Sequence, residues 1–213
     1  MEVFSSTMAL MASHKKAQKH LAAVDPKLAV LIEKYGDCSL EPHTDYYKEL
    51  VDSIVSQQLS VKAARTIFGK FLNLFGDRMP TPKQILETDI ETLRNVGFSY
   101  AKSNYVKDLA ERIVDGRLDL AHIATLPNEE IISQLVAVKG IGEWSAHMFM
   151  IFSLGRTNIL PTGDLGIRKS FMVLYGFNDL PKPQVMLQIS LRNKWEPYQS
   201  IASWYLWRSL DNS

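Results

Sequence analysis

The spacing of apolar residues along this chain predicts helices almost throughout. Apolar side chains recur at the i, i+3, i+4, i+7 and i+8 spacing of one helical face, in the series Tyr47, Leu50, Val51, Ile54 and Val55. The next stretch repeats the pattern with Val61, Ala64, Phe68, Phe71 and Phe75, after which Gly76 is placed to end the helix. Sustained alternation of apolar and polar residues is absent, as is a strong Asn-Gly hairpin signal. We therefore expect an all-α domain of about ten short helices.

Further helices are expected at residues 105–114, 128–137, 144–154, 164–175 and 198–210. Residues 1–24 differ from this body, because a mildly apolar start leads into Ser13-His14-Lys15-Lys16-Ala17-Gln18-Lys19-His20. A transit peptide would be rich in arginine and poor in acids, whereas this segment has no arginine and carries Glu2. We expect residues 1–24 to be a flexible basic tail, part of which can form a helix and dock on the body. Residues 25–213 are expected to form a single domain.

Composition narrows the class of protein. Hydrophobic residues make up 46% and charged residues 22%, which excludes wholesale disorder. Lys plus Arg is 24 and Asp plus Glu is 23, so a nucleic-acid partner would need a local basic patch. The single cysteine, Cys38, excludes an internal disulfide, a CxxC zinc site and a four-cysteine iron–sulfur cluster, and it indicates a reducing compartment. No apolar run approaches the ~18 to 20 residues that span a bilayer, so we expect no membrane partner.

The segment Leu135-x-x-Val138-x-Gly140-Ile141-Gly142-x-x-Ser145-Ala146 predicts two helices joined by a tight hairpin at residues 135–146. Glycines can take positive φ and let the backbone approach an external group closely. The N-terminus of the second helix offers unpaired N–H groups and the positive end of the helix dipole, which suits a phosphate. The Ile141 side chain can pack between the two helices, and the Ser145 hydroxyl can donate a further hydrogen bond to the phosphate. A bare Gly-x-Gly also serves as a plain turn between helices.

An aspartate follows the hairpin pair in the segment Leu160-Pro161-Thr162-Gly163-Asp164. Pro161 and Gly163 break helical structure, and Asp164 then begins a new helix, so Asp164 is a candidate N-cap. An N-cap can also face a cleft. A second helix–Gly–helix layout around Gly97 could supply a phosphate contact through Ser99, Lys102 or nearby amides, or could be an ordinary turn.

The hairpin, the Gly/Pro loop and the aspartate, in this order, resemble the helix-hairpin-helix DNA glycosylase superfamily. Within it the chain is most similar to the 3-methyladenine DNA glycosylase II type of bacteria and fungi. Residues 54–64 and 195–208 carry two further matching motifs, and the resemblance covers about residues 25–210. It implies an all-α glycosylase fold in which two helical subdomains flank a cleft.

The resemblance also implies roles for particular residues. These enzymes flip a damaged nucleotide out of the duplex, and Gln58, Leu59 and Ser60 would fill the gap and face the minor groove. An alkylated purine is cationic and is attracted to aromatic faces. The implied base pocket consists of Trp144, Trp207 and Met148. Each of these tryptophans could instead be core packing, which is what we expect for Trp195 and Trp204.

Three further roles come from the resemblance. Cleavage passes through an oxocarbenium-like sugar, and Asp164 would be the carboxylate that stabilises it. The DNA phosphate would be bound at Lys139, Gly140, Gly142, Ser145 and Ala146. The backbone carbonyls of Val136, Val138 and Ile141 would hold a structural Na⁺ or K⁺, and no cofactor is required.

The expected function is therefore a monofunctional DNA glycosylase that excises alkylated purines, of the 3-methyladenine and 7-methylguanine type, from damaged double-stranded DNA. Trp144 stands where strand-cutting relatives carry a Schiff-base lysine, which argues against a lyase step. We expect a monomer, located in the nucleus in a eukaryote. Gly163 stands where close relatives often have a second acidic residue, and Ser60 where some have a larger side chain. The alternative is thus a glycosylase-like protein that binds abasic or distorted DNA with little or no base excision.

Overall fold

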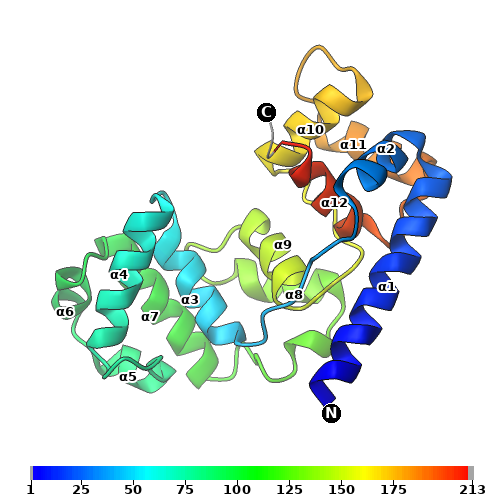
Figure 1. The fold of residues 1–213 in the computed structure, drawn as a ribbon. Helices are drawn as coiled ribbons and strands as arrows, with labels where there is room; N and C mark the ends of the chain where they lie inside the picture. Colours follow the sequence, from blue (N-terminus) through cyan, green and yellow to red (C-terminus); the bar gives the residue numbers. More distant parts are fainter. Residues whose placement is uncertain (1, 211–213) are drawn as a thin grey trace. The chain divides into compact units, whose positions relative to one another are not determined.

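The computed structural model describes residues 2–210, with side chains from residue 10 onward, and every regular element in this range is a helix (Figure 1). The all-α prediction is confirmed. The chain divides into two compact units, one formed by residues 1–42 and 150–213 and the other by residues 43–149. The boundaries therefore fall inside the stretch 25–213 that we expected to be one domain. None of the helices in the described range is long and apolar enough to cross a membrane.

The unit of residues 43–149 is built around one long helix, α7 (Tyr100–Val114). Helix α7 packs against α3 (Tyr46–Ser56), α5 (Pro82–Glu87) and α6 (Ile90–Asn95), and α3 packs on α4 (Val61–Asn73). The unit continues with a 3₁₀ turn (Ile123–Thr125), α8 (Asn128–Val136) and α9 (Glu143–Phe152), whose last residues pass into the other unit.

Two short helices of this unit carry N-cap signals that the apolar spacing does not register. Helix α5 begins with a capping box in which Thr81 and Gln84 satisfy each other's backbone N–H groups. Helix α6 is capped by Asp89, whose carboxylate accepts the Glu91 amide at 2.8 Å. Both helices are six residues long, too short to show helical periodicity.

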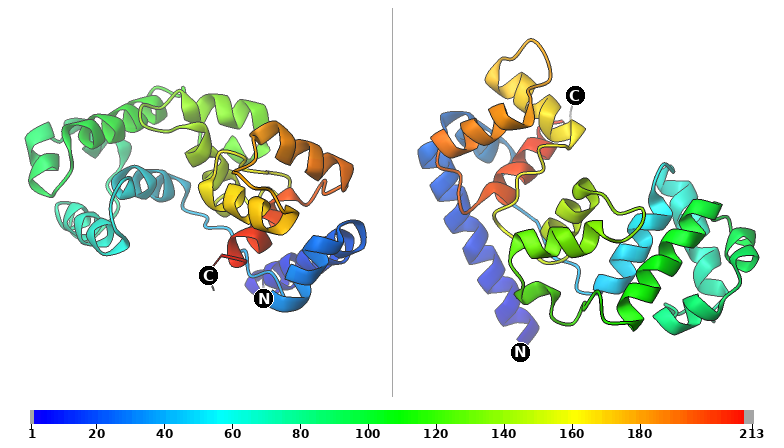
Figure 2. Two further views of the ribbon diagram at one scale, coloured as in Figure 1. Left: turned by 90° about the horizontal axis from the view of Figure 1, so that it is seen from above. Right: turned by 180° about the vertical axis from the view of Figure 1, so that it is seen from behind.

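The other unit contains α1 (Glu2–Val24), α2 (Pro26–Tyr35), α10 (Leu165–Tyr175), α11 (Pro183–Arg192) and α12 (Gln199–Arg208). Helix α1 lies along α2 and α12, and α12 also packs against α2 and α10 (Figure 2). The core of this unit includes the fully buried side chain of Trp195, as predicted.

Residues 2–24 form one continuous helix, which extends well beyond the partial helix that we expected within a flexible tail of residues 1–24. Ala17 and Leu21 are buried on one face of α1, and the Gln18 amide donates to the Tyr205 hydroxyl oxygen at 2.6 Å. His14 is also buried, with its ring 3.2 Å from the Cys38 carbonyl. The exposed face carries Lys15, Lys16 and Lys19. The basic run is thus the solvated side of an amphipathic helix, and the residues between the charges hold it to the unit.

Asp25 joins three parts of this unit through one carboxylate that is 1% exposed. Its Oδ1 accepts the Lys27 amide and caps α2, while Oδ2 accepts the Tyr175 hydroxyl at 2.6 Å, the Asn193 amide at 2.7 Å and the Trp195 indole at 2.9 Å. Burial raises the pKa of Asp25, but these hydrogen bonds favour the charged form and outweigh it, so its pKa lies below the usual value.

Candidate functional site

The hairpin between α8 and α9 has the geometry that the sequence predicts. Helix α8 ends at Val136, α9 begins at Glu143, and the side chains of Val138 and Ile141 are buried in the turn between them. The Ile141 amide donates to the Val138 carbonyl at 3.1 Å, which closes the turn. Ile141 therefore packs inward and leaves the glycine backbone on either side of it at the surface.

Position 140 requires glycine, both for its backbone conformation and for lack of space. Its φ is +83°, and a Cβ built on it would overlap the ring of Tyr105. Its carbonyl accepts a hydrogen bond of 2.8 Å from the Gln57 side chain. Gly142, by contrast, has φ outside the left-handed region and no heavy atom within 4 Å of such a Cβ. Gly140 thus serves the fold of the turn, and Gly142 leaves open space at the start of α9.

A buried carboxylate supports the hairpin from α7. The Lys139 amide donates to Asp108 Oδ2 at 3.0 Å, the Lys139 ammonium lies 3.5 Å from Asp108 Oδ1, and Arg112 donates to Oδ2 at 2.9 Å. Burial raises the pKa of Asp108, but these donors and positive charges bring it below the usual value. No local sequence pattern points to Asp108, because it lies 31 positions before Lys139 and contacts it only in the folded chain.

The N-terminus of α9 is the expected phosphate site, and its amides are not all equivalent. The Ala146 amide makes the first intrahelical hydrogen bond, 3.0 Å to the Gly142 carbonyl. A phosphate here would therefore be held by amides that precede Ala146, since the first four N–H groups of a helix, here those of residues 142–145, have no intrahelical acceptor. Ser145 is partly exposed in this first turn, and the Lys139 side chain is 71% exposed. The phosphate-binding role of these residues stays a prediction.

The carbonyls of Val136, Val138 and Ile141 suit a hard monovalent cation by their chemistry, since oxygen is the donor such ions prefer. Val136 ends α8, where helix carbonyls lack intrahelical donors, and the carbonyl of Val138 has a second lone pair besides the one used by Ile141. Gly140 is not among these donors, and its carbonyl is already used by Gln57.

The expected wedge lies in the turn between α3 and α4. Gln58, Leu59 and Ser60 are all exposed, and Gln58 has φ +58°, a left-handed conformation that is uncommon for a residue other than glycine. Ser60 is the N-cap of α4, because its Oγ accepts the Ala63 amide at 3.3 Å. A projecting turn with an apolar residue at its centre fits the wedge role, which remains a prediction.

The second helix–Gly–helix segment has its two candidate side chains engaged in capping contacts. Ser99 caps α7 by accepting the Lys102 amide at 3.2 Å. The Lys102 ammonium donates to the carbonyls of Val55 at 2.8 Å and Gln57 at 2.7 Å, so it caps the end of α3. Burial lowers the pKa of Lys102. Of the two alternatives from the sequence, these contacts favour the turn.

Asp164 is held at the head of α10 by two donors. Its Oδ1 accepts the Ile167 amide at 2.8 Å, which makes it the N-cap, and also the Trp207 indole N–H at 2.9 Å. A Cβ on Gly166 would lie 3.0 Å from Asp164 Oδ1 and 3.2 Å from Trp207 Cδ1. The glycine therefore makes room for the indole to reach the carboxylate.

Trp207 contacts the Asp164 carboxylate directly, whereas the sequence predicts only that it lines the base pocket. It lies 43 residues after Asp164. Its indole N–H donates to the Asp164 carboxylate, and its ring packs against Phe152 with the ring centroids 5.6 Å apart. Trp144 is 50% exposed at the start of α9, which argues against core packing, and Met148 one turn later is partly exposed. Trp144 and Met148 belong to the unit of residues 43–149, and Asp164 and Trp207 to the other. Their assignment to one base pocket stays a prediction.

A Gly-x-Gly hairpin between two helices, an all-helical body and a capping aspartate in the following loop define a helix-hairpin-helix protein of the DNA glycosylase fold. Residues 51–197 match the HhH-GPD superfamily of base excision DNA repair proteins, and the chain belongs to that family. The family resemblance inferred from the motifs is confirmed.

Several relatives are similar over nearly their whole length. The chain is 36% identical over 200 residues to the alkylbase DNA glycosidase-like protein mag2 of Schizosaccharomyces pombe, covering 92% of this chain and 93% of mag2. It is 34% identical to DNA-3-methyladenine glycosylase 1 of the same yeast, covering 94% of this chain and 89% of that protein.

The fold is also similar to the solved structures of two DNA glycosylases. The 3-methyladenine DNA glycosylase Mag1 of S. pombe, in complex with abasic DNA, superposes with a TM-score of 0.78 at 33% identity, covering 93% of this chain and 98% of Mag1. The DNA-3-methyladenine glycosidase of Bacillus halodurans gives 0.83 at 36% identity, covering 91% of this chain and 88% of that one.

Proposed function

We propose that this protein is a monofunctional DNA glycosylase that flips alkylated purines out of duplex DNA and cleaves the bond between base and deoxyribose. The observation that carries the proposal is the carboxylate of Asp164, fixed at the head of α10 by the Ile167 amide and the Trp207 indole. A carboxylate in a fixed position stabilises the positive charge that develops on the sugar without reorganising during the reaction.

Cleavage of the bond to an alkylated base needs few further catalytic groups. An alkylated purine carries a positive charge, so it departs as a neutral base without a strong general acid. Trp207 orients Asp164 through its indole N–H, and Trp144 offers an exposed aromatic face to a cationic base. The hairpin grips the DNA backbone, and Gln58 to Ser60 fill the space that the flipped nucleotide leaves.

The test is base release from a duplex with one 7-methylguanine, read as strand breaks after hot alkali. We expect breaks with the wild type and with Asp179→Asn, an exposed control on the same unit. Asp164→Asn should release base at least a hundredfold more slowly while still binding DNA. Equal release by Asp164→Asn would remove Asp164 from the reaction.

A second candidate function has its own observations. Gly163 supplies no second acidic side chain next to Asp164, and the small side chain of Ser60 is occupied in capping α4. A protein of this kind could bind abasic or distorted DNA with little excision. The same experiment separates the two functions when a gel shift with an abasic-site analogue is run in parallel. Tight binding to the analogue without strand breaks at any alkylated base would favour the second function.

We further infer that no cofactor is required and that Na⁺ or K⁺ at the carbonyls of Val136, Val138 and Ile141 stiffens the hairpin. DNA affinity should then be several-fold higher in potassium chloride than in choline chloride at equal ionic strength. The protein is proposed to act as a monomer on damaged double-stranded DNA, in the nucleus of a eukaryotic cell. Sedimentation with and without DNA tests the oligomeric state.

A further inference from the structure

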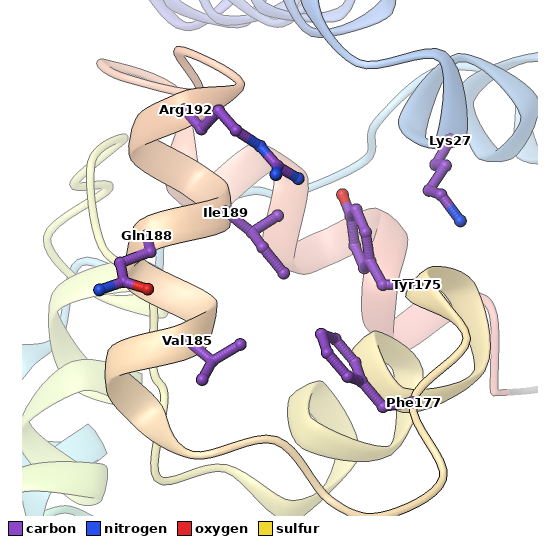
Figure 3. Close-up of a pocket in the computed structure, with 7 residues that line it drawn as sticks. All are labelled: Lys27, Tyr175, Phe177, Val185, Gln188, Ile189 and Arg192. Carbon is purple, nitrogen blue, oxygen red and sulfur yellow. The ribbon is translucent and has the colours of Figure 1, made fainter.

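A pocket of about 650 Å³ lies in the unit of residues 1–42 and 150–213, among α2, α10 and α11. Figure 3 shows side chains from α11 pointing towards Tyr175 and Phe177, which come from the end of α10 and the residues after it. The lining residues are Lys27, Tyr175, Phe177, Val185, Gln188, Ile189 and Arg192. None of them has a role in the proposed base excision, so the pocket is a separate feature of the molecule.

The floor of this pocket is apolar and built into the fold. Phe177 is placed by the C-cap of α10, where Gly176 takes φ +73° and the Phe177 amide donates to the Met172 carbonyl at 2.9 Å. Val185 and Ile189, one helical turn apart on α11, face it. Such a floor favours a bulky apolar group, because burying its surface removes apolar area from water.

Two cations stand at the rim. The Lys27 ammonium donates to the Leu174 carbonyl at 2.5 Å and lies 5.2 Å from the centre of the Tyr175 ring, so it is held in place with two further N–H groups for a ligand. Arg192, in the last turn of α11, points across the pocket towards Tyr175 (Figure 3). Its guanidinium can bind a carboxylate with two parallel hydrogen bonds.

The surrounding segment is basic although the whole chain carries a net charge of only +1. Residues 165–195 contain one acidic residue, Asp179, against the basic residues Arg168, Lys169, Lys182, Arg192 and Lys194. Asp25, which accepts the hydroxyl of the lining residue Tyr175, is already surrounded by donors. The rim therefore favours an acidic ligand.

A peptide fits these features better than nucleic acid does. Tyr175 already stacks on Phe171, with centroids 5.1 Å apart, and carries Lys27 over its ring, so it is poorly placed to stack a base. The aliphatic side chains of Val185 and Ile189 offer nothing to a sugar–phosphate backbone. We propose that this pocket binds a short segment of a protein partner in which a bulky apolar side chain is flanked by Asp or Glu. The apolar side chain enters between Phe177 and α11, and the acids pair with Lys27 and Arg192.

The probe is a fluorescein-labelled peptide with one phenylalanine between two pairs of glutamates, titrated with the full chain and read by fluorescence anisotropy. We expect saturable binding. Affinity should fall at least tenfold when the phenylalanine is replaced by serine, and again when the glutamates are replaced by glutamines. Backbone NMR shifts should cluster at residues 175–177 and 185–192.

The protein variants are Lys27→Glu with Arg192→Glu, and a milder pair with Gln at both positions in case the charge reversal disturbs folding. Each pair should weaken peptide binding at least tenfold and leave base release unchanged. Lys83→Glu, on the exposed surface of α5, reverses one charge elsewhere and should leave peptide binding unchanged. Equal peptide binding by both pairs, or no saturable binding up to about 1 mM, overturns the proposal.

A loss of duplex affinity in these pairs without peptide binding also overturns it, and would assign the two cations to DNA. These outcomes are independent of the proposed function, because base release is measured on the same variants.

Discussion

Gly140 and Gly142 are two positions apart in the hairpin, but the fold leaves room for a side chain only at Gly142. A side chain at Gly140 meets the Tyr105 ring and a left-handed backbone, whereas one at Gly142 meets neither. The motif alone presents the two glycines as equivalent. Their difference arises because α7 brings Tyr105 against one side of the turn.

The first prediction compares Gly140→Ala with Gly142→Ala. Gly140→Ala should lower the free energy of unfolding by about 2 kcal/mol or more, because the Cβ overlaps the Tyr105 ring and the backbone is strained. It should also weaken DNA binding. Gly142→Ala should cost less, about 1 kcal/mol at most, because alanine is a poorer residue than glycine before the first turn of α9 but meets no neighbouring atom there. Urea unfolding of both variants measures this, and equal losses would contradict the assigned role of Tyr105.

A second glycine pair tests the setting of Asp164. Gly166→Ala places a methyl 3.0 Å from Asp164 Oδ1 and 3.2 Å from Trp207, so the hydrogen bond between them must lengthen. The substitution sits in the first turn of α10, where alanine favours helix by up to about 1 kcal/mol. We therefore expect base release to slow at least tenfold with no loss of thermal stability.

The matched control is Gly163→Ala, since no heavy atom lies within 4 Å of a Cβ there. Single-turnover release with the 7-methylguanine duplex should distinguish the two variants. Unchanged release by Gly166→Ala would show that the contact between Trp207 and Asp164 does not position the carboxylate for cleavage.

At the scale of elements, buried polar residues fix how helices meet within each unit. Asp25 caps α2 and receives donors from α10 and from the segment after α11, while Asp108 on α7 holds the hairpin backbone at Lys139. Each is a short carboxylate that replaces water for several donors at once. Removing one would strand those donors in the interior.

The third prediction concerns the pH dependence that Asp25 creates. Because its native pKa lies below the value in the unfolded chain, about 3.9, its stabilisation is complete above about pH 5 and is lost as the pH falls through the native pKa. Asp25→Asn should cost about 3 kcal/mol at pH 7, and this difference from wild type should shrink below pH 4.

The measurement is urea unfolding of both proteins from pH 7 to pH 2.5. Asp179→Asn, at an exposed position, serves as control and should stay near wild type throughout. A cost that is constant over the whole pH range would show that the carboxylate's charge is not what stabilises the fold.

At the scale of the whole molecule, near-neutral net charge and a DNA-repair fold occur together. The net charge is +1, so we expect affinity for DNA to come from local groups, such as those predicted at the hairpin, and not from a general basic field. Helix N-termini and a few lysines can supply those contacts to phosphates.

The fourth prediction follows from phosphate binding. Affinity for a duplex with an abasic-site analogue should fall on the order of a hundredfold between about 50 and 200 mM salt, as for about four phosphate contacts. Fluorescence anisotropy over a salt series measures the slope. Gly140→Ala should reduce both the affinity and the slope, whereas a flat salt response in the wild type would argue against phosphate contacts.

The all-α class, most helix positions, the hairpin and the capping position of Asp164 can all be predicted from the amino-acid sequence. These depend on local spacing: apolar residues at helical intervals, glycines that stop helices, and side chains that cap the next turn. The same locality explains why apolar spacing does not predict the six-residue helices α5 and α6, and why it does not show that residues 2–24 form one continuous helix. Whether an amphipathic basic segment docks depends on a complementary apolar surface elsewhere in the chain.

Which distant residues contact each other becomes visible in the folded chain alone. Trp207 reaches Asp164 across 43 positions, Asp108 reaches Lys139 across 31, and Asp25 collects donors up to 170 positions away. No local pattern encodes such pairs, because the packing of helices sets them. The pocket between Phe177 and α11 belongs to the same class, since its cations come from opposite ends of the chain.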